Sequence, residues 1–450
     1  MRPPEPVIPR RAGPVRRSSY GASSPAIGVR GEKTRALLLD TALPLFERHG
    51  FHGTSIDEIA RAAGVSRATL YQYFGSKEAV FAELLEECGA ALVRVVRRLG
   101  PLGPGVSGFD NLHWWIGEWA WVYDRYATLF VEWSRVDSPG SEFRSMVSRF
   151  VTSFDERIAH RLENSEMDGI DPPDAALVLM SVVHRVNYLR HRGITLGRPA
   201  SVLLDNLAVV MQLFLFPDTT GDVFRAVLPS RRRESDAPGR WPPPQQGAAV
   251  ADACRTRIAE LRPRPAATVR RMLDAGAHLL AASGYHATSV DDIVAAAGLT
   301  RGTFYRYFDE KLDLLVVLSE ECAAASAELA ARFAELAEPA ERDVRLRGWL
   351  ADFVDCHDRY LGVYRAWVDA APEHPVIAQC RRAAAEDLRR SFVRVLRGVE
   401  RAYPLDVGAG AIVLIAILER LPEALREQHP RMAKGQLIDL MARTVQRALL

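Results

Sequence analysis

The sequence predicts an all-α protein composed of two tandem helical units. Apolar residues recur at intervals of three and four, and no segment shows the alternation with a period of two that indicates a strand. The segment from Gly50 to Lys77 reappears from Gly284 to Lys311 without a gap and with about half of its positions identical. The chain of 450 residues is also longer than one hydrophobic core usually supports. A duplicated helical unit accounts for all three observations.

The repeat extends beyond this segment at the same offset. Trp115 aligns with Trp349 and Trp133 with Trp367, so the whole unit is duplicated. We call residues 32–216 the first copy and residues 266–450 the second copy. The predicted domains are a basic arm (1–31), two small domains (32–90 and 266–324), two larger helical domains (91–216 and 325–450) and a linker (217–265).

The arm and the linker have compositions that disfavour a folded core. Proline and arginine recur from Met1 to Gly31 without apolar periodicity, so we expect this arm to be disordered. Its arginines either follow a DNA backbone or minor groove or belong to a solvated tail, and the sequence supports both alternatives equally. The linker contains three consecutive arginines and three consecutive prolines, which indicates a connecting segment.

Composition and charge restrict the classes of function. Hydrophobic residues make up 48% and charged residues 25% of the chain, as in soluble globular proteins. Because the net charge is only +2, affinity for nucleic acid has to come from local basic clusters. The five cysteines lack Cys-x-x-Cys spacing, no signal peptide is evident, and no run reaches the ~20 apolar residues of a membrane span. We expect a soluble cytoplasmic protein with reduced thiols and no metal ion.

Each small domain begins with two helices whose ends are marked in the sequence. In the first copy, an amphipathic helix from Lys33 to His49 stops at Gly50, a residue suited to the left-handed conformation after a helix. The next helix starts at Ser55, whose hydroxyl can cap it while Glu58 reaches back. Ser289 repeats this pattern in the second copy.

A third helix follows after a short turn. Gly64 stops the second helix and Ser66 caps the third, with Thr300 at the cap position of the second copy. Two helices joined by a turn of about four residues that contains Gly form a helix-turn-helix, which places its second helix in the major groove of DNA. The sequence therefore predicts two DNA-binding domains in one chain.

The third helix presents two different faces. Leu70 and Phe74 lie four residues apart and should pack inward, as should Phe304 and Phe308. Arginine can pair with guanine and glutamine with adenine, and a small residue allows close approach to base edges. The opposite face of the helix carries such residues, which are Arg67, Ala68, Tyr71 and Gln72. For Tyr71 the alternative is a core aromatic residue.

Lys77 and Lys311 stand in the first turn of the following helix, where the helix dipole disfavours a cation. A nearby anion would explain both lysines. We expect this anion to be a DNA phosphate, held by the helix N-terminus and the lysine together.

These residues resemble the TetR family of bacterial regulators. The pattern T-S-[IV]-D-[ED]-I, followed by A-A-G-[VL]-[ST]-R-x-T-[LF]-Y-x-Y-F-x-x-K, occurs twice and is similar to the DNA-binding domain of that family. The family usually has one such domain per chain and forms homodimers, whereas this chain has two. The resemblance implies phosphate contacts from Thr69, Tyr71, Lys77, Thr303, Tyr305 and Lys311, and base contacts from Arg67, Ala68, Gln72, Arg301, Gly302 and Arg306; we add the cap residues Ser55 and Ser289 as candidate DNA contacts.

The larger domain of the first copy is rich in aromatic residues. The resemblance implies that this region lines an effector pocket, which would suit a flat or lipid-like apolar molecule. The alternative is that the rings only fill the core. The second copy replaces several rings, so the two pockets would differ and only one need be functional. The candidate pocket residues are Trp115, Trp119, Tyr123, Tyr126, Phe130 and Trp133, with Trp349, Tyr360, Tyr364 and Trp367 in the second copy.

The last two helices of each copy are long and too apolar to remain exposed. The resemblance implies that such helix pairs form the dimer interface of the family, so the two pairs of this chain can cover each other. A homodimer of whole chains is the alternative. The helices are expected over Ala175 to Arg192, Val202 to Phe216, Ala409 to Glu427 and Gln436 to Leu450.

We therefore expect a sequence-specific DNA-binding transcriptional regulator, with the ligand-responsive repression that the resemblance implies. One chain would bind one operator, an imperfect palindrome of double-stranded DNA, and a small apolar or aromatic effector; no cofactor is expected. The chain shows no phosphate-binding glycine loop, no Gly-x-Ser-x-Gly and no His-Glu-x-x-His, so we do not expect an enzyme. The rival hypothesis is an architectural or interaction-type DNA-binding protein without an effector.

Overall fold

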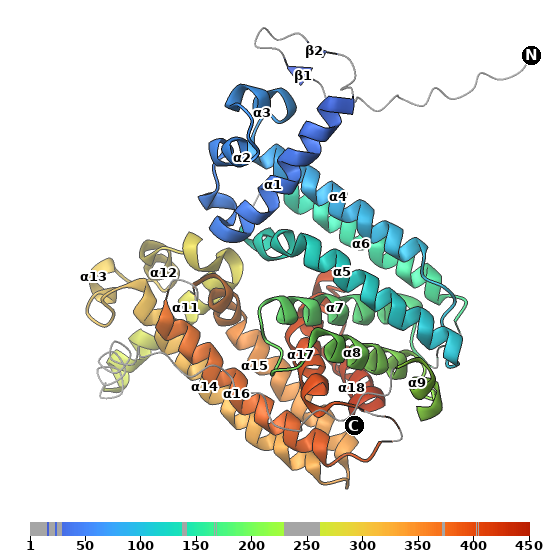
Figure 1. Cartoon of the computed structure of the whole chain (residues 1–450). Helices are drawn as coiled ribbons and strands as arrows, with labels where there is room; N and C mark the ends of the chain where they lie inside the picture. The colour runs from blue at the N-terminus through green and yellow to red at the C-terminus, as the bar shows by residue number, and fades with distance from the viewer. Residues whose placement is uncertain are drawn as a thin grey trace, which may run out of the picture. The chain divides into compact units, whose positions relative to one another are not determined.

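The protein is built from α-helices (Figure 1). The computed structural model describes residues 16–17, 23–24, 29–136, 142–165, 167, 169–228, 262–370, 374–401, 403 and 405–450. Most of the predicted arm and the larger part of the predicted linker lie outside these residues. Within them, the only strands are a two-residue antiparallel pair in the arm, β1 (Arg16–Arg17) and β2 (Ser23–Ser24). The predicted all-α fold class is confirmed.

The first copy contains eight of the described helices. They are α1 (Val29–Gly53), α2 (Ile56–Ala62), α3 (Arg67–Tyr73), α4 (Lys77–Arg97), α5 (Val106–Val136), α6 (Glu142–Leu162), α7 (Pro172–His191) and α8 (Ala200–Leu215). The short α9 (Gly221–Val227) follows them. Phe224 of α9 is fully buried, with its ring 4.8 Å from Phe109 and 5.7 Å from Tyr403. The first part of the predicted linker is therefore folded, because this aromatic contact anchors it.

The second copy repeats the same order. It contains α11 (Pro263–Ala287), α12 (Val290–Ala296), α13 (Arg301–Phe304), α14 (Lys311–Ala334), the 3₁₀ helix η1 (Glu335–Ala337), α15 (Arg342–Ala370), α16 (Pro375–Arg397), α17 (Val407–Gln428) and α18 (Lys434–Leu449). The two copies also share an irregularity of the backbone at equivalent tyrosine residues. Tyr126 interrupts α5 at φ −116° and ψ 20°, and Tyr360 interrupts α15 at φ −109° and ψ 15°.

Two compact units make up the chain, and they do not coincide with the two copies. One consists of residues 1–99 and 115–158, and the other of residues 100–114 and 159–450. In the first unit, α1 packs on α2 and α4 around the rings of Phe46, Phe51 and Phe81, whose centroids are 5.0 to 5.8 Å apart. The helices α7 and α8 of the first copy belong to the second unit.

The second unit joins the terminal helices of both copies. α7 packs against α17, and α8 packs against α18 and α17. Apolar side chains on all four helices are fully buried there, among them Val182, Leu207, Ile417 and Met441. The predicted mutual covering of the two apolar helix pairs is therefore present within one chain.

The cysteines and the apolar helices can be placed on the structure. The described cysteines Cys88, Cys322, Cys356 and Cys380 are not joined in disulfide bonds, and burial raises the pKa of Cys88 and of Cys322 to about 12. No helix in the described part of the chain combines the length and the apolar character needed to cross a membrane.

Candidate nucleic-acid interface

Both helix-turn-helix segments have the predicted turn. α2 ends at Ala62, and Gly64 then takes a left-handed conformation with φ 68°. The amide of Val65 donates to Ala60 O over 3.0 Å, which closes the turn before the cap residue Ser66. In the second copy Gly298 has φ 63° and Leu299 N donates to Val294 O over 2.8 Å. A left-handed residue is required at this point, which explains why both copies carry glycine.

The capping boxes at the start of α2 and α12 are present as predicted. Ser55 N donates to Glu58 Oε2 over 2.9 Å, and Glu58 N donates to Ser55 Oγ over 3.2 Å. Ser289 and Asp292 make the same pair of contacts, at 2.9 and 3.1 Å. The hydrogen bond from the Ser55 backbone holds the pKa of Glu58 below its usual value. Both serines remain exposed, and their role as DNA contacts stays a prediction.

Arg67 forms the centre of an exposed cluster at the start of α3. Its Nη1 lies 3.1 Å from Asp57 Oδ2, its Nη2 donates to Tyr71 Oη over 3.4 Å, and its guanidinium lies 5.5 Å from the centre of the Tyr71 ring. The hydrogen bond to Tyr71 and the charge of Asp57 raise the pKa of Arg67. The side chain of Arg67 is 62% exposed, so it is oriented and still faces solvent.

The second copy reproduces this cluster almost atom for atom. Arg301 Nη1 lies 3.1 Å from Asp291 Oδ2, and Nη2 donates to Tyr305 Oη over 3.4 Å. Tyr305 is 44% exposed and Tyr71 38%, so neither is the core aromatic residue that the alternative required. Asp57 and Asp291 were not among the predicted site residues. Their sequence signal is an aspartate ten positions before the arginine in both copies.

The remaining faces of the third helices are arranged as predicted. Leu70, Phe74, Phe304 and Phe308 are at most 2% exposed and form the inner face. Ala68, Gly302 and Arg306 are exposed, whereas Gln72 is half-buried. The hydroxyl groups of Thr69 and Thr303 lie 2.8 and 2.9 Å from those of the cap residues Ser66 and Thr300.

The third helices of the two copies, α3 and α13, differ in length. α3 runs to Tyr73 and includes Gln72, but α13 already ends at Phe304, so Arg306 lies in the turn that follows it. Arg306 is therefore presented from a turn, whereas Gln72 is presented from a helix, and the base contact expected of Arg306 stays a prediction. Gly302 stands where α3 has Ala68, and glycine lowers helix stability relative to alanine by ~1 kcal/mol, which favours the shorter helix.

Lys77 and Lys311 have protein partners that the sequence prediction did not include. Lys77 Nζ donates to Phe51 O over 2.6 Å and to Thr54 O over 2.9 Å, and lies 4.5 Å from the centre of the Phe51 ring. Lys311 Nζ donates to Tyr285 O and Thr288 O over 2.6 and 2.7 Å. Carbonyl groups at the end of the first helix thus explain both lysines without a phosphate, because they accept from a cation as helix C-termini do. A direct phosphate contact by the lysines stays a prediction.

The aromatic residues of the larger domains are mostly buried. Trp115, Trp119, Tyr123 and Tyr126 are at most 5% exposed, and Phe130 stacks on Tyr123 with ring centres 4.5 Å apart. The side chain of Trp133 lies outside the described residues. In the second copy Trp349, Tyr360 and Trp367 are buried and Tyr364 is half-buried.

The two copies differ in how they satisfy the buried indole groups. Trp349 Nε1 donates to Leu329 O and Trp367 Nε1 to Ser319 Oγ, both over 2.8 Å. Trp115 Nε1 and Trp119 Nε1 are buried, and no hydrogen-bond acceptor meets either of them in the part of the chain that the structure describes. Buried donors without partners are costly, so these two groups mark a place where an acceptor is missing.

Comparison with known proteins places the two helix-turn-helix segments in one family. The model of bacterial regulatory proteins of the tetR family matches residues 38–84 and 272–318, which are related by the offset of the repeat. The chain is 46% identical over 54 residues to the putative mycofactocin biosynthesis transcriptional regulator MftR of Mycobacterium tuberculosis, which covers 12% of this chain and 27% of that protein. It is 40% identical over 68 residues to the HTH-type transcriptional regulator RutR of Escherichia coli, which covers 14% and 32%. The matched regions thus span about a third or less of these relatives.

A weaker likeness is to a solved structure. A transcriptional regulator of the TerR/AcrR family from Aquifex aeolicus aligns with 40% of this chain and 95% of its own chain, with a TM-score of 0.32 and 19% identity.

Proposed function

We propose that this chain, which carries two DNA-binding domains of the TetR family, is a sequence-specific transcriptional regulator in which one chain occupies one operator. The observation that carries the proposal is the cluster of arginine, tyrosine and aspartate at the start of both α3 and α13. An ion pair that orients an exposed guanidinium on a helix-turn-helix suits contact with a base edge. Its occurrence in both domains supports two half-site contacts by one chain.

Each recognition helix would divide its contacts between bases and phosphates. Arg67 and Arg301 would exchange part of their contact with aspartate for guanine O6 and N7, while Ala68 and Gly302 allow the backbone to approach. The exposed hydroxyl of Tyr71 and the threonine beside the helix cap suit phosphate oxygens. These contacts fix the register of each domain on the duplex.

The basic arm supports the same binding mode. β1, which consists of Arg16 and Arg17, packs against α3 in the first unit (Figure 1). Of the two alternatives for the arm, this position beside the recognition helix favours a contact with the DNA backbone or minor groove next to the first half-site.

The two half-sites would be similar but unequal. Gln72 of the first domain prefers adenine, whereas Arg306 of the second prefers guanine. The different lengths of α3 and α13 add a second source of inequality, because they present these side chains from a helix in one domain and from a turn in the other. The proposed operator is therefore an imperfect palindrome.

The packing of the terminal helices supports one chain per operator. Helix pairs of the kind that join two chains in TetR homodimers are α7 with α8 and α17 with α18, and here they bury their apolar residues against each other. The tether between the copies also raises their effective concentration for each other. A second chain is then not needed to bring two domains to one site.

The effector site would lie in the larger domain of the first copy. Trp115 Nε1 and Trp119 Nε1 supply two buried donors, and their rings stand 5.8 Å apart. We infer an apolar or aromatic molecule with at least one hydrogen-bond acceptor. The second copy does not offer the same site, because Leu329 O already accepts from Trp349, the equivalent of Trp115, and Phe353 stands at the position equivalent to Trp119.

Repression would follow from occupancy of the operator, and the effector would release the protein. A ligand can do this only if it prefers a conformation of the domains that does not match the groove. The alternative of an effector-independent architectural protein would give Trp115 Nε1 and Trp119 Nε1 no role in binding a ligand.

The experiment is footprinting on DNA flanking the gene, followed by light scattering of the complex with the minimal protected site. One chain of 49.9 kDa per site supports the proposal, and two chains per site contradict it. Arg67→Ala and Arg301→Ala should each weaken one half of the footprint.

Effectors are then sought as aromatic or acyl compounds that release the complex, with Trp115→Phe as a variant that removes one indole donor while keeping an aromatic ring. Release that is unchanged in this variant argues against the proposed site.

A further inference from the structure

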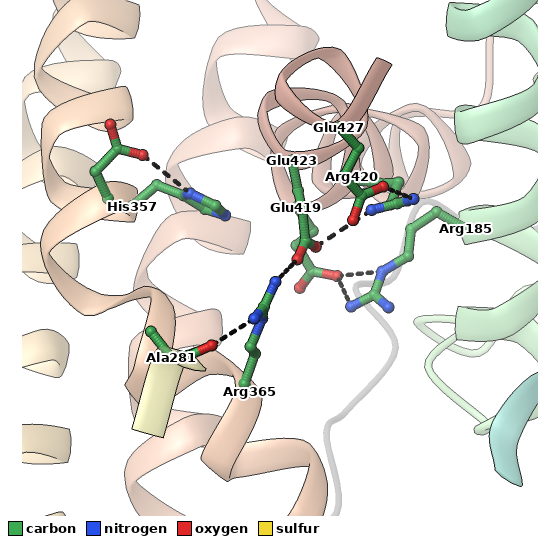
Figure 2. A network of polar contacts seen from close by, with 9 residues as sticks. Arg185, Ala281, His357, Arg365, Glu419, Arg420, Glu423 and Glu427 are labelled. Carbon is green, nitrogen blue, oxygen red and sulfur yellow. Dashed lines mark hydrogen bonds and ion pairs between the residues drawn. The ribbon is translucent and has the colours of Figure 1, made fainter. Parts of the chain in front are cut away.

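A single position of the repeat lies at the centre of the contact between the copies. α7 packs against α17, which is its equivalent in the second copy. Arg185 of α7 and Glu419 of α17 are 234 residues apart, which is the offset of the repeat, and they bind each other (Figure 2). Arg185 Nε donates to Glu419 Oε2 over 2.8 Å, and Nη2 donates to the same oxygen. Two equivalent residues that touch lie on the pseudo-twofold axis between the copies.

The charges at this position distinguish the two copies. If the first copies of two chains paired through the same helices, Arg185 of one chain would face Arg185 of the other. If the second copies of two chains paired, Glu419 of one chain would face Glu419 of the other. Like charges in contact repel, whereas the combination of a first with a second copy places opposite charges together.

A second contact favours the same combination. Arg198 Nε donates to Asp406 Oδ1 over 2.8 Å. Gly408 makes room for this guanidinium, because a Cβ at that position would lie 2.9 Å from Arg198 Nε. The second copy has Met432 at the position equivalent to Arg198, so a pair of second copies would leave Asp406 without this donor.

The exposure of Arg185 and Glu419 indicates that their ion pair adds little stability. The side chain of Arg185 is 24% and that of Glu419 40% exposed. The guanidinium of Arg185 also lies 4.6 Å from the centre of the Tyr188 ring, and the charge of Glu419 acts on Arg381 of α16. A partly exposed ion pair of this kind contributes little to stability, but reversal of one charge acts directly on the choice of partner.

We propose that the opposite charges at positions 185 and 419 favour pairing of a first copy with a second copy. They disfavour pairing between two first copies and between two second copies. The partner of residues 172–215 is thus the helix pair of residues 407–449 of the same chain. The inference rests on the proposed function, because one chain can occupy one operator only if its two copies pair with each other.

Three full-length variants test this contact. Arg185→Glu and Glu419→Arg each place like charges inside the chain, and the double variant restores opposite charges in reverse order. A mixture of the two single variants offers opposite charges only between chains. We expect mass photometry to find more particles of twice the chain mass in this mixture than in either variant alone, while wild type and the double variant stay at 49.9 kDa. Urea midpoints should fall in both single variants and recover in the double variant.

Arg332→Glu is the control, because it reverses a charge in the exposed ion pair of Arg332 and Asp352 inside the second copy. It should leave the mass unchanged. The proposal is overturned if the double variant is as unstable or misfolded as the single variants, since position 185 then needs arginine itself rather than an opposite charge. It is also overturned if the mixture dimerises no more than wild type. No readout uses DNA, so a failure to find an operator would refute the proposed function and leave this result standing.

Discussion

We expect the free energy of unfolding to fall as the pH is lowered from 7 to 5, because of His184 in α7. Burial lowers the pKa of this imidazole from its usual 6.5 to about 3, and the charges of Arg420 and Arg185 act in the same direction. Below pH 6.5 the unfolded chain binds a proton that the folded chain does not bind until about pH 3, so the folded state loses stability as the pH falls. Integrated from pH 7 to 5, the loss is about 2 kcal/mol, an upper limit because the residue keeps some contact with solvent.

Urea unfolding of the full chain at pH 7, 6 and 5, followed by circular dichroism, measures this effect. His184→Leu is the matched variant, because position 418, its equivalent in the repeat, carries leucine. Between pH 7 and 5 the variant should lose less stability than wild type, by up to about 2 kcal/mol. Equal losses in both proteins would refute the reasoning, because His184 would then bind protons equally in the folded and unfolded states.

Three further predictions concern the helix-turn-helix domains and their support. Lys77→Met should destabilise the first domain by about 1–3 kcal/mol, because its carbonyl partners lose a charged donor, and an unchanged urea midpoint would contradict this. Gly362→Ala should cost about 1–3 kcal/mol or more, since the added Cβ would lie 2.2 Å from Ala277 O, whereas Gly302→Ala should be tolerated in unfolding experiments because nothing lies within 4 Å of its Cβ. Arg306→Gln should shift one half-site from guanine toward adenine by ~1–3 kcal/mol in binding selections, and unchanged selectivity at every position would remove this residue from base recognition.

The helix-turn-helix domains could be predicted from the sequence because their determinants are local. The capping box at Ser55 spans three residues, and Gly64 adopts its left-handed conformation within the turn itself. The burial of Leu70 and Phe74 follows from their spacing on one helix. Signals of this kind act over a few residues and recur at the same offset in the second copy, so each copy supports the interpretation of the other from sequence alone.

For some residues of the interface the sequence did not predict the surroundings, because these are formed by segments that meet only when the chain folds. The sequence shows that Lys77 opens a helix, but not that the carbonyls of Phe51 and Thr54 lie within hydrogen-bond distance of it. It shows arginine at position 306, but not that α13 ends before this residue. Asp57 was missed as the partner of Arg67 because the two are joined only when the turn brings α2 and α3 together.

The sequence by itself determined the helical fold class, the duplication and the two DNA-binding domains, because periodicity, caps and repeated motifs are properties of short segments. Only the tertiary structure decided that α7 and α8 of the first copy belong to one compact unit with the second copy. It also decided that Arg185 meets Glu419 across 234 residues. The physical reason is that apolar helix faces specify burial without specifying a partner, whereas the partner depends on which charges and shapes coincide once the chain has folded.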